Sequence, residues 1–169
     1  MNQRFIIMFL GVLVLFVAGC GGEKKPDGMP AIYPTTITFT QDGSPLVGAT
    51  VTLVAQDQAN TQWPSGGATD NNGVLRVKTK GFDGAPVGTF KVVVTKTETE
   101  GTAVAVELSD AAGAKPAASG GDQKSYYLVE KDYRSAATTT LTLEVKSGKN
   151  AETFDLGKAI REPIPVYTN

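Results

Sequence analysis

A regular alternation of apolar and polar side chains from residue 35 onward constrains the fold of this chain most. The segment "TITFTQ" places Ile37 and Phe39 on one side of an extended backbone and threonines on the other. The segment "ATVTLVAQ" repeats the arrangement with Val51 and Leu53. Successive side chains of a strand point to opposite faces, and β-branched residues favour strands. Each segment therefore predicts a strand with one buried face.

Four further segments carry the same period of two, and turn signals separate them. The alternating residues lie at 75–77, 90–94, 141–145 and 154–156. Asp-Gly, Asp-Asn-Asn-Gly and Ser-Gly-Lys-Asn stretches at 42–43, 70–73 and 147–150 predict tight turns. No long helical pattern lies between these segments. We therefore expect an all-β chain folded as an antiparallel β-sandwich.

The composition excludes several kinds of function. The 169 residues include no histidine and one cysteine, so neither a serine nor a cysteine triad with a histidine base can form. With 16 basic and 17 acidic side chains, the chain has no charge excess that would attract nucleic acid. We expect no catalysis, no cofactor and no nucleic-acid partner. A hydrolase built on a carboxylate pair is the remaining catalytic alternative, and no such pair stands out.

The first nineteen residues have the organisation of a secretory signal. Arg4 is followed by a run, residues 5–18, without a polar side chain. At a rise of about 1.5 Å per residue this run reaches roughly 21 Å, which is less than the ~30 Å hydrocarbon core of a bilayer. A charged start, a short apolar middle and small residues at the end predict a signal peptide at 1–19. A short membrane helix that stays attached is the alternative.

The end of this segment, Val17-Ala18-Gly19-Cys20, resembles the lipobox of bacterial lipoproteins. The resemblance implies cleavage before Cys20, a diacylglyceryl thioether on its sulfur, and acylation of the new amine by a fatty acid such as palmitate. Two or more acyl chains hold a protein stably on a membrane. A buried, inert cysteine is the alternative. Gly21 stands where an aspartate would resemble an inner-membrane retention signal, which favours the outer membrane in a cell that has one.

Residues 20–34 are rich in glycine, proline and charge, which predicts a flexible tether between the lipid and the folded domain. Cleavage would remove Arg4 and leave 15 basic against 17 acidic side chains, a net charge of about −2. This net charge gives no reason to expect attraction to lipid headgroups.

Three segments of the expected sandwich resemble the carboxypeptidase regulatory-like domains. They are "DGSPLVGATVTLV", "GGATDNNGVLRV" and "GAPVGTFKVVVTK". The matching residues are Asp42, Gly43, Pro45, Leu46, Gly48, Ala49, Val51, Thr69, Asp70, Gly73, Pro86, Gly88, Phe90, Val92 and Val94. The resemblance covers residues 35–157. It implies a seven-stranded transthyretin-like or immunoglobulin-like sandwich that has no peptidase activity of its own.

Two segments depart from this pattern. Residues 98–123 are longer than a simple strand connection, and their Ala/Gly/Ser-rich part predicts a mobile insertion, with a short extra strand allowed at 104–108. The tail at 158–169 contains Pro163 and Pro165, which favour extended backbone. A loose terminus is the expectation for this tail. Contact with an edge strand or with a partner is the alternative.

Aromatic residues and one turn are the candidate binding sites. Trp63, Tyr126 and Tyr127 can offer ring faces to a sugar or another ligand, and packing at the edge of the sandwich is the alternative. Asp70 and Asn72 carry closely spaced oxygens that suit part of a calcium site, which needs about six to eight oxygen ligands. The alternative is a hairpin turn in which these side chains bind local amides.

The sequence thus predicts a lipid-anchored protein of the bacterial cell envelope whose β-sandwich is a structural or protein-interaction module. Binding of a polysaccharide or small ligand is the second hypothesis, and hydrolysis is the least favoured one. The expected partners are the membrane, through lipid on Cys20, and an envelope protein or glycan.

Overall fold

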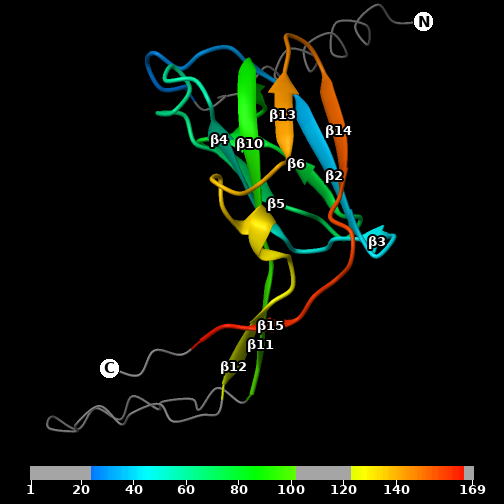
Figure 1. The fold of residues 1–169 in the computed structure, drawn as a ribbon. Coiled ribbons are helices and arrows are strands. Elements are labelled where there is room, and N and C mark those ends of the chain that lie inside the picture. Colours follow the sequence, from blue (N-terminus) through cyan, green and yellow to red (C-terminus); the bar gives the residue numbers. More distant parts are fainter. Residues whose placement is uncertain (1–23, 102–122, 166–169) are drawn as a thin grey trace, which may run out of the picture.

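The computed structural model describes residues 24–101 and 123–165 (Figure 1). The predicted signal peptide, Cys20, residues 102–122 of the predicted insertion and the last four residues lie outside this part. The elements are β1 (Ile32–Tyr33), β2 (Thr35–Gln41), β3 (Ser44–Pro45), β4 (Thr50–Ala55), β5 (Ser65–Ala68), β6 (Val74–Arg76), β7 (Lys78–Thr79), β8 (Phe82–Asp83), β9 (Ala85–Pro86), β10 (Gly88–Thr95), β11 (Thr97–Glu100), β12 (Lys124–Tyr127), the 3₁₀ helix η1 (Lys131–Arg134), β13 (Thr142–Val145), β14 (Asn150–Asp155) and β15 (Glu162–Pro163).

The predicted all-β class is confirmed. The expected seven strands do not match these elements one to one, since several of the observed strands are only two residues long. Within the described residues, no helix has the length and apolar character needed to span a bilayer.

Two sheets form the body of the molecule. The first has the order β13-β10-β4-β5-β7-β8 and is antiparallel throughout. Its longest pair, β4 and β10, runs from Ala55 beside Phe90 to Thr50 beside Thr95. The second sheet has the order β14-β2-β3, and β6 also pairs with β2. This arrangement is that of a β-sandwich.

One strand pair differs from the antiparallel prediction. β14 runs parallel to β2, from Asn150 beside Thr35 to Asp155 beside Thr40. The preceding strand, β13, belongs to the other sheet, where it pairs with β10. The turn at 146–149 therefore carries the chain from one sheet to the other while reversing its direction. That reversal brings β14 beside β2 in the same direction as β2.

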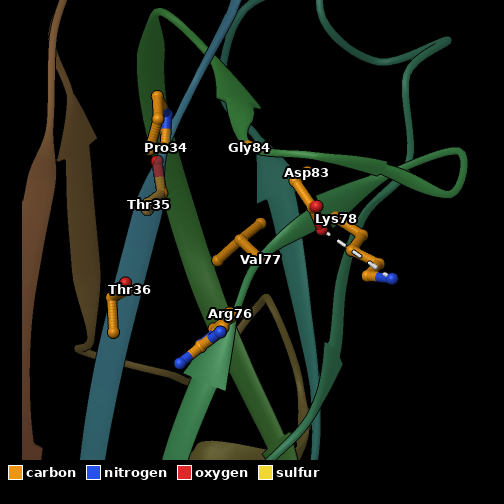
Figure 2. A pocket seen from close by; sticks show the side chains of 8 residues that line it. All are labelled: Pro34, Thr35, Thr36, Arg76, Val77, Lys78, Asp83 and Gly84. Carbon is orange, nitrogen blue, oxygen red and sulfur yellow. Dashed lines mark ion pairs between the residues drawn. The ribbon is translucent and has the colours of Figure 1, made fainter. Parts of the chain in front are cut away.

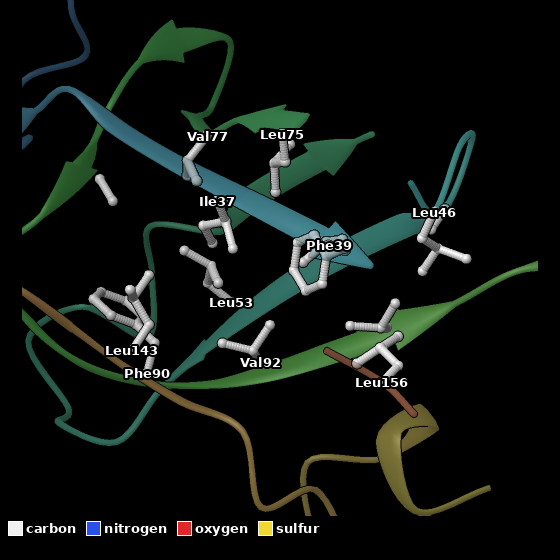
Figure 3. Packing of buried hydrophobic residues seen from close by; sticks show 14 of the residues in the cluster. Ile37, Phe39, Leu46, Leu53, Leu75, Val77, Phe90, Val92, Leu143 and Leu156 are labelled. Carbon is white, nitrogen blue, oxygen red and sulfur yellow. The ribbon is translucent and has the colours of Figure 1, made fainter. Parts of the chain in front are cut away.

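The apolar residues of the alternating segments form one core between the two sheets (Figure 3). Ile37 and Phe39 of β2 are fully buried and face Leu53 of β4 and Val92 of β10. Phe154 of β14 packs against Phe39, with ring centroids 5.8 Å apart. Burying such side chains stabilises the fold by roughly 1.5–3 kcal/mol each. The predicted inward faces of the strands are therefore confirmed.

The predicted turns are also present. Asp42 and Gly43 both have positive φ, 51° and 68°, between the paired residues Gln41 and Ser44, which is the geometry of a two-residue hairpin turn. Gly73 has a φ of 71°, and a Cβ built on it would lie 2.5 Å from the carbonyl oxygen of Phe39. Only glycine tolerates both the backbone conformation and this close approach.

Ordered structure extends beyond the predicted domain boundaries. The predicted tether ends in β1, whose Ile32 and Tyr33 pair with Pro86 and Ala85. The first residues of the predicted insertion lie in β11, which pairs with β12. The predicted tail contains β15, which pairs with the other edge of β12. Of the expectations for the tail, the described residues thus show contact with an edge strand.

Candidate functional site

Strands β11, β12 and β15 form a separate small sheet in the order β11-β12-β15, which we call the arm. β10 leads into β11 with one residue between them, so the arm projects beyond the sandwich (Figure 1). All four residues of β11 are exposed, and those of β12 are half-buried or exposed. The arm therefore has little apolar core, and contacts between side chains on its two faces contribute much of the stability of this small sheet.

One face of the arm carries Tyr126, Arg161 and two glutamates. The Arg161 guanidinium lies 3.8 Å from the centre of the Tyr126 ring. It also forms ion pairs with Glu98, at 3.9 Å between Nε and Oε2, and with Glu100. A guanidinium over an aromatic face is favourable, and the two carboxylates add to it. Arg161 thus ties the tail to both β11 and β12.

The opposite face carries Tyr127, Arg134 and Glu162. The Arg134 guanidinium, from η1, lies 3.9 Å from the centre of the Tyr127 ring and pairs with the Glu162 carboxylate. The Arg134 side chain is 12% exposed, and its Nε has no hydrogen-bond partner among the described residues. Tyr126 and Tyr127 are neighbours in one strand, which is why they point to opposite faces. One arginine therefore stacks on each face of β12, Arg161 on one and Arg134 on the other.

A cavity of about 490 Å³ opens beside this second arginine. It is lined by Thr95, Tyr127, Lys131, Arg134, Ser135, Glu162, Ile164 and Pro165. Arginine and lysine are obligate hydrogen-bond donors, and a buried Nε–H without an acceptor is costly. The cavity is therefore suited to an anionic group that reaches the guanidinium.

The outer edge of β11 has no strand beside it among the described residues. The amide of Leu128 donates to the carbonyl oxygen of Lys96 at 2.9 Å, which fixes the phase of the β11–β12 ladder. Hydrogen-bonded and non-hydrogen-bonded positions alternate in an antiparallel pair. The backbone groups of Thr97 and Thr99 therefore point to the outer edge, where an extended segment of a partner could pair with them.

Trp63 lies in the loop between β4 and β5 and is 7% exposed. The Lys80 ammonium covers its ring at 5.2 Å from the centroid. A cavity of about 200 Å³ adjoins the ring, lined by Leu53, Val54, Ala55, Asn60, Thr61, Trp63 and Pro64. Asn60 fixes the loop by donating from Nδ2 to the Val87 carbonyl at 2.8 Å. Trp63 is thus mainly a packing residue, and ligand binding by it stays a prediction.

The structure does not bring Trp63 and the two tyrosines together. Trp63 lies near Ala55, at the end of the sandwich where β10 begins. The tyrosines lie beyond the other end of β10, which is eight residues long. At about 3.3 Å per residue the strand alone separates them by roughly 26 Å. One aromatic platform formed by all three residues is therefore excluded.

The Asp70 carboxylate is used within its own turn. Its Oδ1 accepts hydrogen bonds from the amides of Asn72, at 2.8 Å, and Val74, at 2.9 Å. These two bonds, the Val74 bond foremost, hold the pKa of Asp70 below its ordinary value. In the described residues, no group of three or more metal-ligating Asp, Glu, His or Cys side chains occurs. The geometry is that of a tight turn between β5 and β6, and calcium binding at Asp70 and Asn72 stays a prediction that a calcium titration of the melting temperature tests.

A third cavity, of about 400 Å³, lies where the chain passes from β6 in the second sheet to β7 in the first (Figure 2). It is lined by Pro34, Thr35, Thr36, Arg76, Val77, Lys78, Asp83 and Gly84. Lys78 and Asp83 form an ion pair at 3.7 Å. The cavity lies at the end of the sandwich where the chain enters it through β1.

Comparison with known proteins adds no relative: no protein-family model, no curated protein and no solved structure matches the chain. The site therefore rests on its own geometry. Reasoning from the sequence named Tyr126 and Tyr127 but missed Arg134 and Arg161. The adjacent tyrosines and the later "KDYR" and "IREP" segments were the available signal. Which ring Arg161 covers depends on the register between β12 and β15, and the position of Arg134 depends on how η1 lies against the arm.

Proposed function

We propose that this chain is a cell-envelope lipoprotein, held in the membrane by lipid on Cys20, whose non-catalytic β-sandwich acts as a protein-interaction module. The lipobox at residues 17–20 supports the anchor, and the outer membrane is the proposed location in a cell that has one. The all-β fold, together with the motifs at 42–51, 69–73 and 86–94, supports membership in the carboxypeptidase regulatory-like domains.

The observation that carries the interaction proposal is the outer edge of β11, which has no strand beside it in the part of the chain that the structure describes and lies on an arm that projects from the sandwich. Exposed edges pair readily with a strand from another chain. The arm holds this edge away from the body of the domain, and the Arg161 ion pairs keep it extended. We therefore propose that an envelope protein adds an extended segment to β11.

Crosslinking in intact cells, followed by mass spectrometry, tests this proposal with two substitutions of one residue. Thr99→Pro removes an outward-pointing amide, whereas Thr99→Val keeps it; both lose the hydroxyl contact with Ser125 at 3.0 Å. We expect the native protein and the valine variant to capture the same envelope protein and the proline variant to lose it. Equal capture by all three proteins would contradict pairing at β11.

Binding of a small acidic ligand or polysaccharide is the second candidate function, favoured by the cavity beside Arg134. The Arg134 guanidinium and the Lys131 ammonium, which both line this cavity, would hold a carboxylate or a sulfate group there. A thermal-shift screen of acidic oligosaccharides against the native protein and an Arg134→Gln variant tests it. A ligand that stabilises both proteins equally does not bind in this cavity.

A further inference from the structure

The end of the sandwich where the chain enters has a charge of its own. The register places Thr35 beside Asn150 and Gly88 beside Val145, so the start of β2, the start of β10 and the β13–β14 turn lie at one end. Figure 1 shows the segment before β1 at this same end, opposite the arm. We call it the tether end and define it as the described residues at or beyond the Thr36–Arg76 pair.

Exposed basic side chains reach the tether end from three separate parts of the sequence. Lys24 and Lys25 precede β1, Arg76, Lys78 and Lys80 come from β6 to the β7–β8 turn, and Lys146 and Lys149 flank the tip of the β13–β14 turn. Four acidic residues share this end: Asp27, Asp57, Asp83 and Glu144. The tether end thus has seven positive and four negative charges, a net charge of +3.

Most of these carboxylates already have local partners. Asp83 pairs with Lys78 at 3.7 Å, and Glu144 pairs with Lys146 at 3.2 Å. Asp57 accepts hydrogen bonds from the backbone and side chain of Asn60. Lys24, Lys25, Arg76, Lys80 and Lys149 form no ion pair with another described residue. Lys80 lies over the Trp63 ring, and the charges of the other four residues face solvent.

The remaining described residues are acidic on balance, with seven basic and nine acidic side chains. Exposed charges more than about 10 Å apart are largely screened from each other at 0.1 M salt. The length of β10 alone is more than twice this distance. A surface at the tether end therefore experiences the local +3, not the −1 of the whole chain.

We propose that the tether end is a docking surface for anionic lipid headgroups, so that the sandwich rests on the bilayer with the arm pointing away from it. This inference rests on the proposed anchor at Cys20. Eleven residues lie between Cys20 and Ile32, and a flexible chain of this length spans roughly 20 Å on average. The anchor would thus hold the tether end within reach of the headgroups, where each nearby lysine strengthens attraction to an anionic surface.

Trp63, the only tryptophan of the chain, lies at the tether end and serves as the probe. The lipidated mature protein is reconstituted in vesicles of phosphatidylcholine, with or without phosphatidylglycerol, that carry a dansyl-labelled lipid. Energy transfer from Trp63 to the label reports how close the tether end lies to the bilayer. We expect greater transfer with phosphatidylglycerol and a return to the phosphatidylcholine level in high salt.

Charge reversal at the two ends of the molecule supplies a matched pair of variants. Lys146→Glu with Lys149→Glu changes the tether end from +3 to −1 and should weaken headgroup association by at least about tenfold, removing the increase in transfer. Lys124→Glu with Lys158→Glu makes the same change in total charge, but away from the tether end. This variant should retain the increase in energy transfer. Lys24→Gln with Lys25→Gln lies outside every strand and should reduce the increase without affecting folding.

Equal transfer in the two kinds of vesicle, or equal loss in both reversal variants, would overturn the proposal. If a soluble acidic polysaccharide added to neutral vesicles lowers the energy transfer from Trp63, the surface would be assigned to that ligand instead of to headgroups. The anchor is scored separately, by the intact mass at Cys20 and by flotation with neutral vesicles. Failure of the proposed lipoprotein function is thereby distinguished from failure of headgroup docking.

Discussion

Two glycines with left-handed backbone differ in what surrounds them. Gly73 has a φ of 71° and lies where a Cβ would meet Phe39 O at 2.5 Å, whereas Gly148 has a φ of 104° and no atom within 4 Å of that position. Alanine at either position costs roughly 1–3 kcal/mol in backbone strain. Gly73→Ala should cost about 1–3 kcal/mol more because of the overlap. Urea unfolding of both variants measures this difference, and equal midpoints would contradict the close approach.

Asp70 gives a pH-dependent prediction at the same turn. The hydrogen bonds from the Val74 and Asn72 amides lower its pKa below the ordinary value of 3.8. A carboxylate with a lowered pKa stabilises the folded protein above its ordinary pKa and loses that contribution as the pH falls through its lowered value. Asp70→Asn keeps an acceptor oxygen without the charge. We therefore expect the native protein to melt higher than the variant at neutral pH, with a difference that shrinks below pH 3.8.

Melting curves by circular dichroism between neutral pH and about pH 2 follow this difference. Asp155→Asn is a useful control, because the Asp155 carboxylate accepts one backbone amide, from Gly157, instead of two. A difference between native protein and Asp70→Asn that is constant with pH would contradict the role of the two amides.

The arm is the element whose stability depends most on individual side chains. Arg161 stacks on Tyr126 and pairs with Glu98 and Glu100. Exposed ion pairs and a cation–π contact together contribute on the order of 1 kcal/mol. Arg161→Ala should therefore speed amide hydrogen exchange in β12 about fivefold, and high salt should reproduce part of the effect. Arg76→Ala, which removes an exposed arginine with no ion pair in the described residues, should leave β12 exchange unchanged.

The strands of the sandwich could be predicted from the sequence because burial imposes a period of two on them. β2, β4 and β10 show it over six to eight residues each. The arm could not be predicted in this way, since exposed strands carry no such period. β15 was missed because Pro163 and Pro165 argue against regular structure. Yet the Ile164 amide donates to the Ser125 carbonyl oxygen. Pro163 and Pro165 lie on either side of Ile164, at positions whose amides would point away from β12, and an edge strand needs no donor there.

At the scale of the whole molecule, the core and the arm should unfold as separate units. Phe90 is fully buried in the core, whereas Tyr126 of β12 is half-buried and lies beneath the Arg161 guanidinium of the arm. Phe90→Ala should lower the free energy of unfolding by about 3–5 kcal/mol. Tyr126→Ala should shift the melting temperature of the sandwich by less than about 2 °C while exposing the arm to protease. A large loss of melting temperature in Tyr126→Ala would show that the arm and core form one cooperative unit.

The parallel pair of β2 and β14 also sets the order of events in folding. β2 is the first long strand of the domain, and one of its edges is completed only by β14, from residue 150 onward. Contacts this distant in sequence form slowly, because a long loop must close before they are made. A chain emerging from the ribosome therefore keeps that edge of β2 open until nearly all of its residues have been synthesised. The last long strand to appear closes the first, and the sandwich becomes complete late and as a unit.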